Sequence, residues 1–308
     1  MRTTRLVAIA CALGVGVAPA AAHSQTDHAA AAAATAAATS TAASPVRVGY
    51  APVHGLRMYY EIHGTGRPLV LLHGGGSTIS TTFGKVLPTL AKTRRVIAVE
   101  LQGHGHTADI DRPLTFEQDA DDVAALLRQL GIARADIFGF SNGGNVALEM
   151  GIRHPELVHK LIVASAFFRS DGIYPAVRES FKHATPDNMP AVLRDAYNAE
   201  APHPEHLPVL VAKLMTRLLD FKDVPPATLR AISAPTLVML GDADIIRPEH
   251  AAEMAHLLPH SQLAIFPSSG HGAYLGEVTA PPCSYCPGAA VSMIEAFLDA
   301  PMPAGTRR

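Results

Sequence analysis

The chain has 308 residues, of which 48% are hydrophobic and 17% charged, and its formal net charge is −2 at pH 7. This balance provides no basic face for the phosphate backbone of a nucleic acid, so we expect no nucleic-acid partner. The length suffices for one large hydrophobic core, and the absence of internal repeats and interior low-complexity linkers favours a single domain.

The first residues have the pattern of a secretory signal peptide. Arg2 and Arg5 precede an apolar run over 6–17, and the small-residue stretch APAAA follows over 18–22. Charge, apolar run and small residues in this order predict cleavage after Ala22. An uncleaved anchor is the alternative, but the run is shorter than the roughly 20 residues that span a bilayer. We therefore expect a secreted or periplasmic protein with no stable membrane insertion after cleavage.

Residues 23–45, which end at Pro45, are dominated by Ala, Thr and Ser and contain no large apolar side chain. A disordered spacer is predicted, because nothing in this stretch could pack against a core. A transient helix is the alternative, since alanine favours helix, but without a packed face it would be marginal. The folded domain is expected to occupy residues 46–308.

Strand-like and helix-like patterns alternate through the folded domain. This alternation predicts an α/β fold with a mostly parallel sheet and helices on both faces. The helix over 115–131 has the strongest signals, with the capping-box spacing of Thr115 and Gln118 at its start and Gly131 at its end. The predicted strands are LRMYYEIH (56–63), PLVLLHG (68–74), RRVIAVEL (94–101), DIFGF (136–140), KLIVASA (160–166), PTLVMLG (235–241) and QLAIFP (262–267), and further helices are predicted over 142–154, 248–258 and 289–299.

One stretch, from Phe167 to Ala231, interrupts the alternation. It contains no convincing strand, and its aromatic residues and leucines lie in short helical pieces separated by prolines. We interpret it as an inserted helical cap over the sheet. Ordinary peripheral helices are the alternative, because sequence alone rarely distinguishes a cap over an active site from helices packed at the side of a domain.

The sequence GFSNGG, residues 139–144, places a serine between glycines where a predicted strand meets a predicted helix. A sharp strand-to-helix turn forces its central residue into a sparsely allowed conformation, and side chains two residues away would collide there. Ser141 is therefore expected to project into a crevice as a nucleophile. The N–H of Asn142, at the helix start, is expected to be free to stabilise an oxyanion. A glycine-rich packing turn is the alternative.

A second glycine-rich segment, HGGG over 73–76, ends the strand PLVLLHG. Residues without Cβ allow backbone N–H groups to approach a substrate closely, so Gly75 is predicted to be the second oxyanion donor, with Gly76 behind it. A phosphate-binding loop is the alternative, although neither known glycine-rich phosphate pattern is present. His73 is expected to be structural.

Two further strand ends carry polar residues. Asp244, in GDADIIRPEH after the strand PTLVMLG, can orient and charge-stabilise an imidazole. Asp242 and Asp171 are its rivals, and a turn-forming role is the alternative for all three. His271 follows the last predicted strand and is the candidate general base, because the order Ser, Asp, His is the one expected on a doubly wound sheet. Activity should then rise with pH through an acidic limb.

Two histidine and cysteine patterns remain. His104 and His106 in QGHGHT are spaced like metal ligands, yet no third ligand is evident and a glycine-rich turn explains them. Cys283 and Cys286 form CSYC, which in an oxidising compartment is interpreted as a small disulfide loop. A redox pair or half of a metal site are the alternatives.

Together these segments resemble the α/β-hydrolase superfamily over roughly residues 56–299. GTGRPLVLLHGGG, ELQGHGHT, GFSNGG, APTLVMLGDADIIRPEH and SGHG match its segments in order, with Glu100 where Asp is commoner. The resemblance implies an α/β-hydrolase fold with an eight-stranded, mostly parallel sheet and a cap after the sixth strand. It implies Ser141 as nucleophile, Asp244 as acid and His271 as base.

The resulting hypothesis is a serine hydrolase that cleaves a carboxylic ester with no cofactor. The apolar cap suggests a small-molecule substrate with an apolar acyl or aromatic group. Cofactor-free perhydrolases and carbon–carbon bond hydrolases on the same three residues are alternatives, as is a non-catalytic ligand-binding protein.

Overall fold

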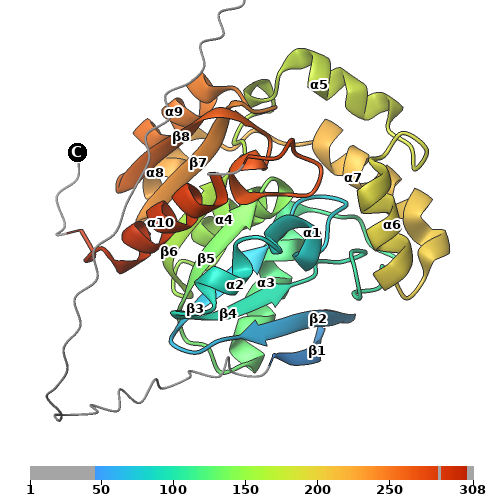
Figure 1. The fold of residues 1–308 in the computed structure, drawn as a ribbon, viewed down its shortest axis with the longest axis horizontal. Helices are drawn as coiled ribbons and strands as arrows, with labels where there is room; N and C mark the ends of the chain where they lie inside the picture. Colours follow the sequence, from blue (N-terminus) through green and yellow to red (C-terminus); the bar gives the residue numbers. More distant parts are fainter. Residues whose placement is uncertain (1–45, 284–285, 304–308) are drawn as a thin grey trace, which may run out of the picture. The chain divides into compact units, whose positions relative to one another are not determined.

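The computed structural model describes residues 46–283 and 286–303, so the predicted signal segment and spacer lie outside the described residues (Figure 1). The described chain forms an eight-stranded sheet in the order β1-β2-β4-β3-β5-β6-β7-β8. Strands β1 and β2 run antiparallel to their neighbours, and the others are parallel. The strands are β1 (Arg47–Val53), β2 (Leu56–His63), β3 (Arg67–Leu72), β4 (Arg94–Val99), β5 (Ala135–Phe140), β6 (Val158–Ala164), β7 (Thr236–Ala243) and β8 (Ser261–Gly270).

Helices cover both faces of the sheet because successive side chains of a strand point to opposite sides. In β3, Val70 and Leu72 join the core under α3, α4, α8 and α9, whereas Leu69 and Leu71 join the core under α1, α2 and α10. The continuous apolar runs in the sequence reflect this double burial. The helices are α1 (Ile79–Phe83), α2 (Leu87–Leu90), α3 (Phe116–Gln129), α4 (Asn142–Arg153), α5 (Pro175–Ser180), α6 (Ala191–Glu200), α7 (Leu207–Leu219), α8 (Pro226–Ala231), α9 (Pro248–Leu257) and α10 (Cys286–Asp299).

The predicted strands and long helices are confirmed, and three elements are additional. Strand β1 lies at the sheet edge, where its residues alternate between exposed and buried only from Ala51 onward. Helices α1 and α2 follow β3 and have five and four residues, too few for a helical period to be visible.

Helix α3 has the predicted ends, with one difference. The Thr115 side chain accepts a hydrogen bond from the Gln118 N–H, but the Gln118 side chain donates to Asp122 instead of completing a capping box. At the other end Gly131 has φ +67, and the N–H groups of Gly131 and Ile132 close the helix on the carbonyls of residues 128 and 127.

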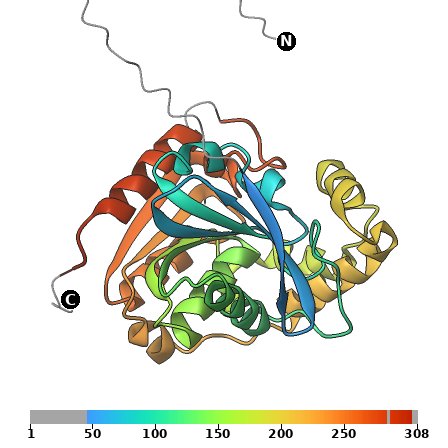
Figure 2. The same ribbon diagram turned by 90° about the horizontal axis from the view of Figure 1, so that it is seen from below.

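The segment between β6 and β7 forms α5 to α8 and contains only an isolated bridge, Ile173 to Ile246, in place of a strand. Helices α6 and α7 lie on the opposite side of the described domain from α10 in both ribbon views, and Figure 1 shows α5 above them (Figures 1 and 2). Helices α6 and α7 share a small core of their own around Tyr197, Leu210 and Leu214. We call α5 to α7 the cap. A buried ion pair of 2.7 Å between Arg217 of α7 and Asp119 of α3 fixes it to the domain.

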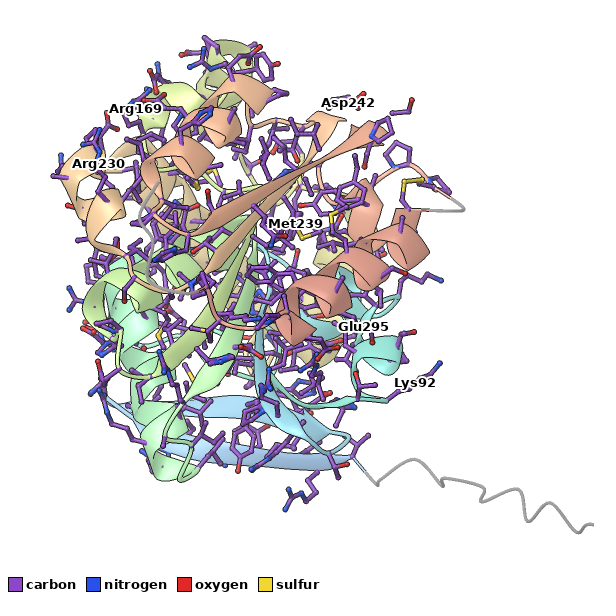
Figure 3. The ribbon with its side chains drawn as sticks, turned by 90° about the vertical axis from the view of Figure 1, so that its left-hand side faces the viewer. Lys92, Arg169, Arg230, Met239, Asp242 and Glu295 are labelled. Carbon is purple, nitrogen blue, oxygen red and sulfur yellow. A yellow bond between two sulfur atoms is a disulfide. The ribbon has the colours of Figure 1, made fainter. Side chains whose placement is uncertain are left out.

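Cys283 and Cys286 are joined by a disulfide, which confirms the predicted loop closure. Figure 3 shows its yellow bond beside the first turn of α10. Within residues 46–283 and 286–303, no helix combines the length and apolar character needed to cross a bilayer.

Candidate active site

Ser141 lies in a strained turn between β5 and α4. Its φ is +54° and its ψ −120°, in a region that costs a non-glycine residue about 1–3 kcal/mol. A Cβ on Gly139 would lie 1.9 Å from the Gly143 carbonyl oxygen, and a Cβ on Gly143 would lie 2.1 Å from that of Leu72. Only glycine fits at both positions, so this sequence permits a turn that holds Ser141 at the carboxyl end of the sheet.

The structure brings together the three side chains predicted from separate loops. The His271 Nε2 lies 3.0 Å from the Ser141 Oγ, and the His271 Nδ1 lies 2.7 Å from the Asp244 Oδ1. An ionised carboxylate can only accept hydrogen bonds, so Nδ1 carries the proton and Nε2 is left to accept from the Ser141 hydroxyl. This tautomer is the one a general base requires.

Asp244 is buried but well supplied with hydrogen-bond donors. Burial alone would raise the pKa of Asp244, but the charge of His271 and hydrogen bonds from His271, Ser165 and the Ile246 N–H outweigh burial and hold the pKa below its ordinary value. The carboxylate therefore stays ionised beside the imidazole.

Sequence reasoning missed the hydroxyl pair behind Asp244. The Ser165 hydroxyl donates to the Asp244 Oδ2 at 2.5 Å, and the hydroxyl oxygens of Ser165 and Tyr274 lie 2.7 Å apart. Ser165 follows β6 and has a φ of +51°, and the φ of Ser141 is also positive. Two of the four non-glycine residues with positive φ in the described chain therefore lie at this site. The only sequence signal for Ser165 was its position after β6. Its partners Asp244 and Tyr274 lie 79 and 109 residues further along the chain, so no local pattern connects them.

The predicted oxyanion donors lie against each other. A Cβ on Gly75 would lie 2.0 Å from the Asn142 side-chain nitrogen, so the Asn142 side chain packs directly against the Gly75 backbone. Neither the Gly75 N–H nor the Asn142 N–H donates a hydrogen bond to another group of the described chain. Gly76 differs from the expectation, since its N–H donates to the His104 Nε2 at 3.0 Å.

His73 and His104 are structural. Both are completely or almost completely buried, and burial lowers the pKa of His73 to about 4 and that of His104 well below its ordinary value. The His73 Nε2 accepts a hydrogen bond from the Leu101 N–H. The two rings therefore remain neutral and tie the loop after β3 to the loop after β4.

The two rival carboxylates lie elsewhere. Asp242 accepts from the Ser269 N–H and is exposed at the end of β7, where Figure 3 labels it. Asp171 forms an ion pair with Arg169. Neither contacts His271, so Asp244 is the carboxylate that the geometry selects.

A cavity of about 180 Å³ opens at Ser141 and His271, and a second of about 320 Å³ lies beside it under the cap. Gly75, Phe181, Leu214 and Met215 line both, so they form the shared wall. Among the residues that the structure describes, no Lys, Arg, Asp or Glu lines either cavity. The space in front of Ser141 is thus apolar.

The sequence and the fold are those of a known family. The sequence model of the alpha/beta hydrolase family matches residues 69–280, and the chain belongs to this family. It is 28% identical over 242 residues to 2-hydroxymuconate semialdehyde hydrolase of Pseudomonas sp. strain CF600, covering 70% of this chain and 84% of that protein. It is also 28% identical over 239 residues to the serine hydrolase BPHL of Homo sapiens, covering 72% of this chain and 79% of that protein.

Solved structures show the same fold. A serine hydrolase involved in carbazole degradation, the CarC enzyme, superposes with a TM-score of 0.68 at 24% identity, covering 82% of this chain and 99% of that one. A thermophilic esterase from Thermogutta terrifontis superposes with a TM-score of 0.65, also at 24% identity, covering 82% and 98%.

Proposed function

We propose that the protein is a serine hydrolase that cleaves an uncharged carboxylic ester with an apolar acyl or aromatic group. The observation that carries the proposal is the continuous hydrogen-bonded line from Asp244 through His271 to Ser141, which opens into an apolar cavity beside two free backbone N–H groups. Nucleophile, base, orienting carboxylate and oxyanion donors are the parts that acyl transfer needs.

The geometry supports the following sequence of steps. The Ser141 Oγ attacks the ester carbonyl while the His271 Nε2 takes its proton, and Asp244 stabilises the resulting imidazolium. The N–H groups of Gly75 and Asn142 hold the oxyanion, each worth about 3–4 kcal/mol to the transition state. His271 returns the proton to the departing alcohol. His271 then takes a proton from a water molecule, which attacks the acyl-enzyme. The proton passes to the Ser141 Oγ as the carboxylic acid leaves.

The apolar walls favour an uncharged ester over an anionic substrate for carbon–carbon cleavage. The Pseudomonas relative is named as a hydrolase of 2-hydroxymuconate semialdehyde, which by this name carries a carboxylate. Burying a carboxylate without a cationic partner is costly, and neither cavity provides Lys or Arg within the described chain. We therefore expect nitrophenyl esters of medium-chain acids to be turned over and a 2-hydroxy-6-oxo-dienoate to be a poor substrate. The reverse preference would refute the ester assignment.

Replacing the nucleophile tests the mechanism. Ser141→Ala should reduce nitrophenyl ester turnover by about 10³-fold or more, because no other group can form the acyl-enzyme. The fold should be retained, since alanine fills less space, and labelling by a fluorophosphonate should be lost. Ser292→Ala, on the exposed side of α10, is the matched control and should keep full activity. Near-full hydrolysis by Ser141→Ala would exclude this mechanism.

We also propose export from the cytoplasm, with cleavage after Ala22. The sequence pattern of residues 1–22 supports this location, and the Cys283–Cys286 disulfide is compatible with an oxidising compartment. Sequencing the N-terminus of the protein from a periplasmic or culture fraction should start at His23, whereas an intact Met1 in the cytoplasm would refute the location.

A further inference from the structure

The loop after β4 contains a histidine that the proposed reaction does not use. Of the two histidines in QGHGHT, His104 is engaged, because its Nε2 accepts from Gly76 and its Nδ1 lies 2.9 Å from the Gln102 carbonyl. His106 is partly exposed, and its Nδ1 lies 2.9 Å from the Glu100 Oε2. The sequence offered no third ligand beside this pair.

The cap supplies the missing group. Glu200 is the last residue of α6, and one ligand atom from each of Glu100, His106 and Glu200 lies within 4.8 Å of the other two. Glu200 is only partly buried, and the Ser80 hydroxyl donates to its Oε1 at 3.4 Å. Two carboxylates and an imidazole thus converge from the core loop and the cap.

This cluster lacks a compensating positive charge. The Glu100 side chain is 2% exposed, and its Oε1 accepts no hydrogen bond from the described residues. Within 46–283 and 286–303, no Lys or Arg forms an ion pair with Glu100 or Glu200. A buried carboxylate facing a second one is costly unless a cation joins them.

We propose that Glu100, His106 and Glu200 bind one divalent transition-metal cation, with Zn²⁺ the best match. Imidazole and carboxylate are ordinary zinc ligands, and water would complete a four-coordinate site. The Glu100 Oε2 and the His106 Nδ1 are already close enough to share one ion once the proton between them leaves. Ligand atoms in such a site lie about 3.3 Å apart, so ligand atoms separated by as much as 4.8 Å must close by up to about 1.5 Å.

Such a site would connect the cap to the core. Glu100 directly follows β4, whereas Glu200 ends α6, so a bound cation would restrain α6 against the loop after β4. The cavity under the cap is lined by residues that precede and follow α6, including Met189 and Val211. This restraint on the cap does not depend on the proposed ester hydrolysis.

Thermal unfolding of the full chain tests the site. After chelation and dialysis, Zn²⁺ at tens of micromolar should raise the Tm of the wild type by about 5 °C or more. Glu200→Gln and His106→Gln should each lose most of this shift, because each removes one of three ligands. Asp195→Asn, which removes an exposed charge from the same helix, should retain it. Hydrogen exchange in α6 should slow with Zn²⁺ in the wild type and in Asp195→Asn only.

The same measurements can overturn the proposal. The rings of the exposed His203 and the partly buried His206 stack 5.0 Å apart and are the competing zinc ligands on the cap. The double variant His203→Gln/His206→Gln should keep the full Tm shift. The proposal is wrong if Zn²⁺ gives the wild type no shift, if both ligand variants keep it, or if His106→Gln loses it while Glu200→Gln does not.

Discussion

Two strained serines share one carboxylate at this site. Ser141 reaches Asp244 through His271, whereas Ser165 contacts Asp244 directly. Strained backbone persists where surrounding interactions demand it, and both residues follow strands at the carboxyl edge of the sheet. The strain at Ser165 is therefore best explained by the orientation of its hydroxyl toward Asp244.

Ser165→Ala should weaken both stability and catalysis. The Asp244 Oδ2 would keep only a 3.5 Å contact with the Gly241 N–H, and losing a hydrogen bond to a buried charge costs about 1.5–3 kcal/mol. We expect Tm to fall by about 5 °C at neutral pH and kcat by about tenfold. The measurements are thermal unfolding and steady-state ester hydrolysis.

The pH dependence of that Tm difference identifies its cause. The pKa of Asp244 is held below its ordinary value, so its contribution is present above about pH 4 and is lost as pH falls through the lowered pKa. The difference between wild type and Ser165→Ala should therefore shrink below pH 4. Tyr274→Phe, which leaves the Ser165–Asp244 bond intact, should not show this pattern. A difference that is constant with pH would indicate lost packing instead.

The sequence identified those site residues whose roles have a local signature. Ser141 is flanked by the glycines that its turn requires, and His271 follows a strand between glycines. Ser165 also has a positive φ but has Val163, not glycine, two residues before it, so nothing in the sequence VASA (163–166) distinguishes it from an ordinary strand end. Its role depends on Tyr274 and Asp244, which are distant along the chain, and only the folded structure brings them together.

At the scale of elements, the turn between β5 and α4 is the most constrained connection. A Cβ on Gly143 would lie 2.1 and 2.6 Å from the carbonyl oxygens of Leu72 and His73. Backbone cannot yield as a flexible side chain can, so β3 and α4 would have to separate. The position after α3 is the opposite case, since Gly131 has φ +67° but nothing within 4 Å of its hypothetical Cβ.

Comparing the stability of Gly131→Ala with that of Gly143→Ala separates the cost of backbone strain from the cost of a steric clash with neighbouring backbone. Gly131→Ala should cost about 1 kcal/mol, the penalty of a left-handed conformation for a residue with a Cβ. Gly143→Ala should cost more than about 4 kcal/mol, or prevent folding, because strain and collision add. Urea denaturation measures both, and soluble yield reports on Gly143→Ala if it fails to fold. Equal costs would mean that the turn relaxes more easily than the structure indicates.

Elements were predictable where their burial was regular. Strands β3 to β7 are buried on both faces and appear as continuous apolar runs, whereas β1 contains Gly49 and Pro52 and lies at an edge. The additional helices α1 and α2 owe their positions to Phe83 and Leu90, which complete the core under α10. That packing is tertiary, so no local period indicates it.

At the scale of the whole molecule, buried groups act on stability in opposite directions. Burial lowers the pKa of His250 to about 4, as it does for His73, so the unfolded chain binds more protons and stability falls as pH drops from about 6.5 to 4. Burial raises the pKa of Asp119 to about 6 and that of Glu149 to about 7, so stability falls as pH rises through 4 to 7. The two sets offset one another between about pH 4.5 and 6.

This balance predicts a broad pH optimum of stability, which a single substitution can shift toward higher pH. Glu149, on α4, has its pKa raised by burial and by the charges of Glu117 and Asp121, against the opposing charge of Arg153. Its cost is absent below about pH 4.5, where both states are protonated, and complete above about pH 7. Glutamine has the same shape without the charge. Glu149→Gln should therefore match the wild type at pH 4.5 and exceed its Tm by about 4 °C at pH 8, after allowance for partial exposure.

Thermal unfolding at pH 4.5, 6 and 8 measures this difference, which should grow with each step. Glu249→Gln is the control, because it removes a carboxylate from an exposed position in the first turn of α9 and should give no gain at pH 8. A gain for Glu149→Gln that is already complete at pH 4.5 would assign the effect to packing. No gain at pH 8 would mean that water or Arg153 neutralises the carboxylate more fully than its burial implies, and the fall of stability with rising pH would then depend on Asp119.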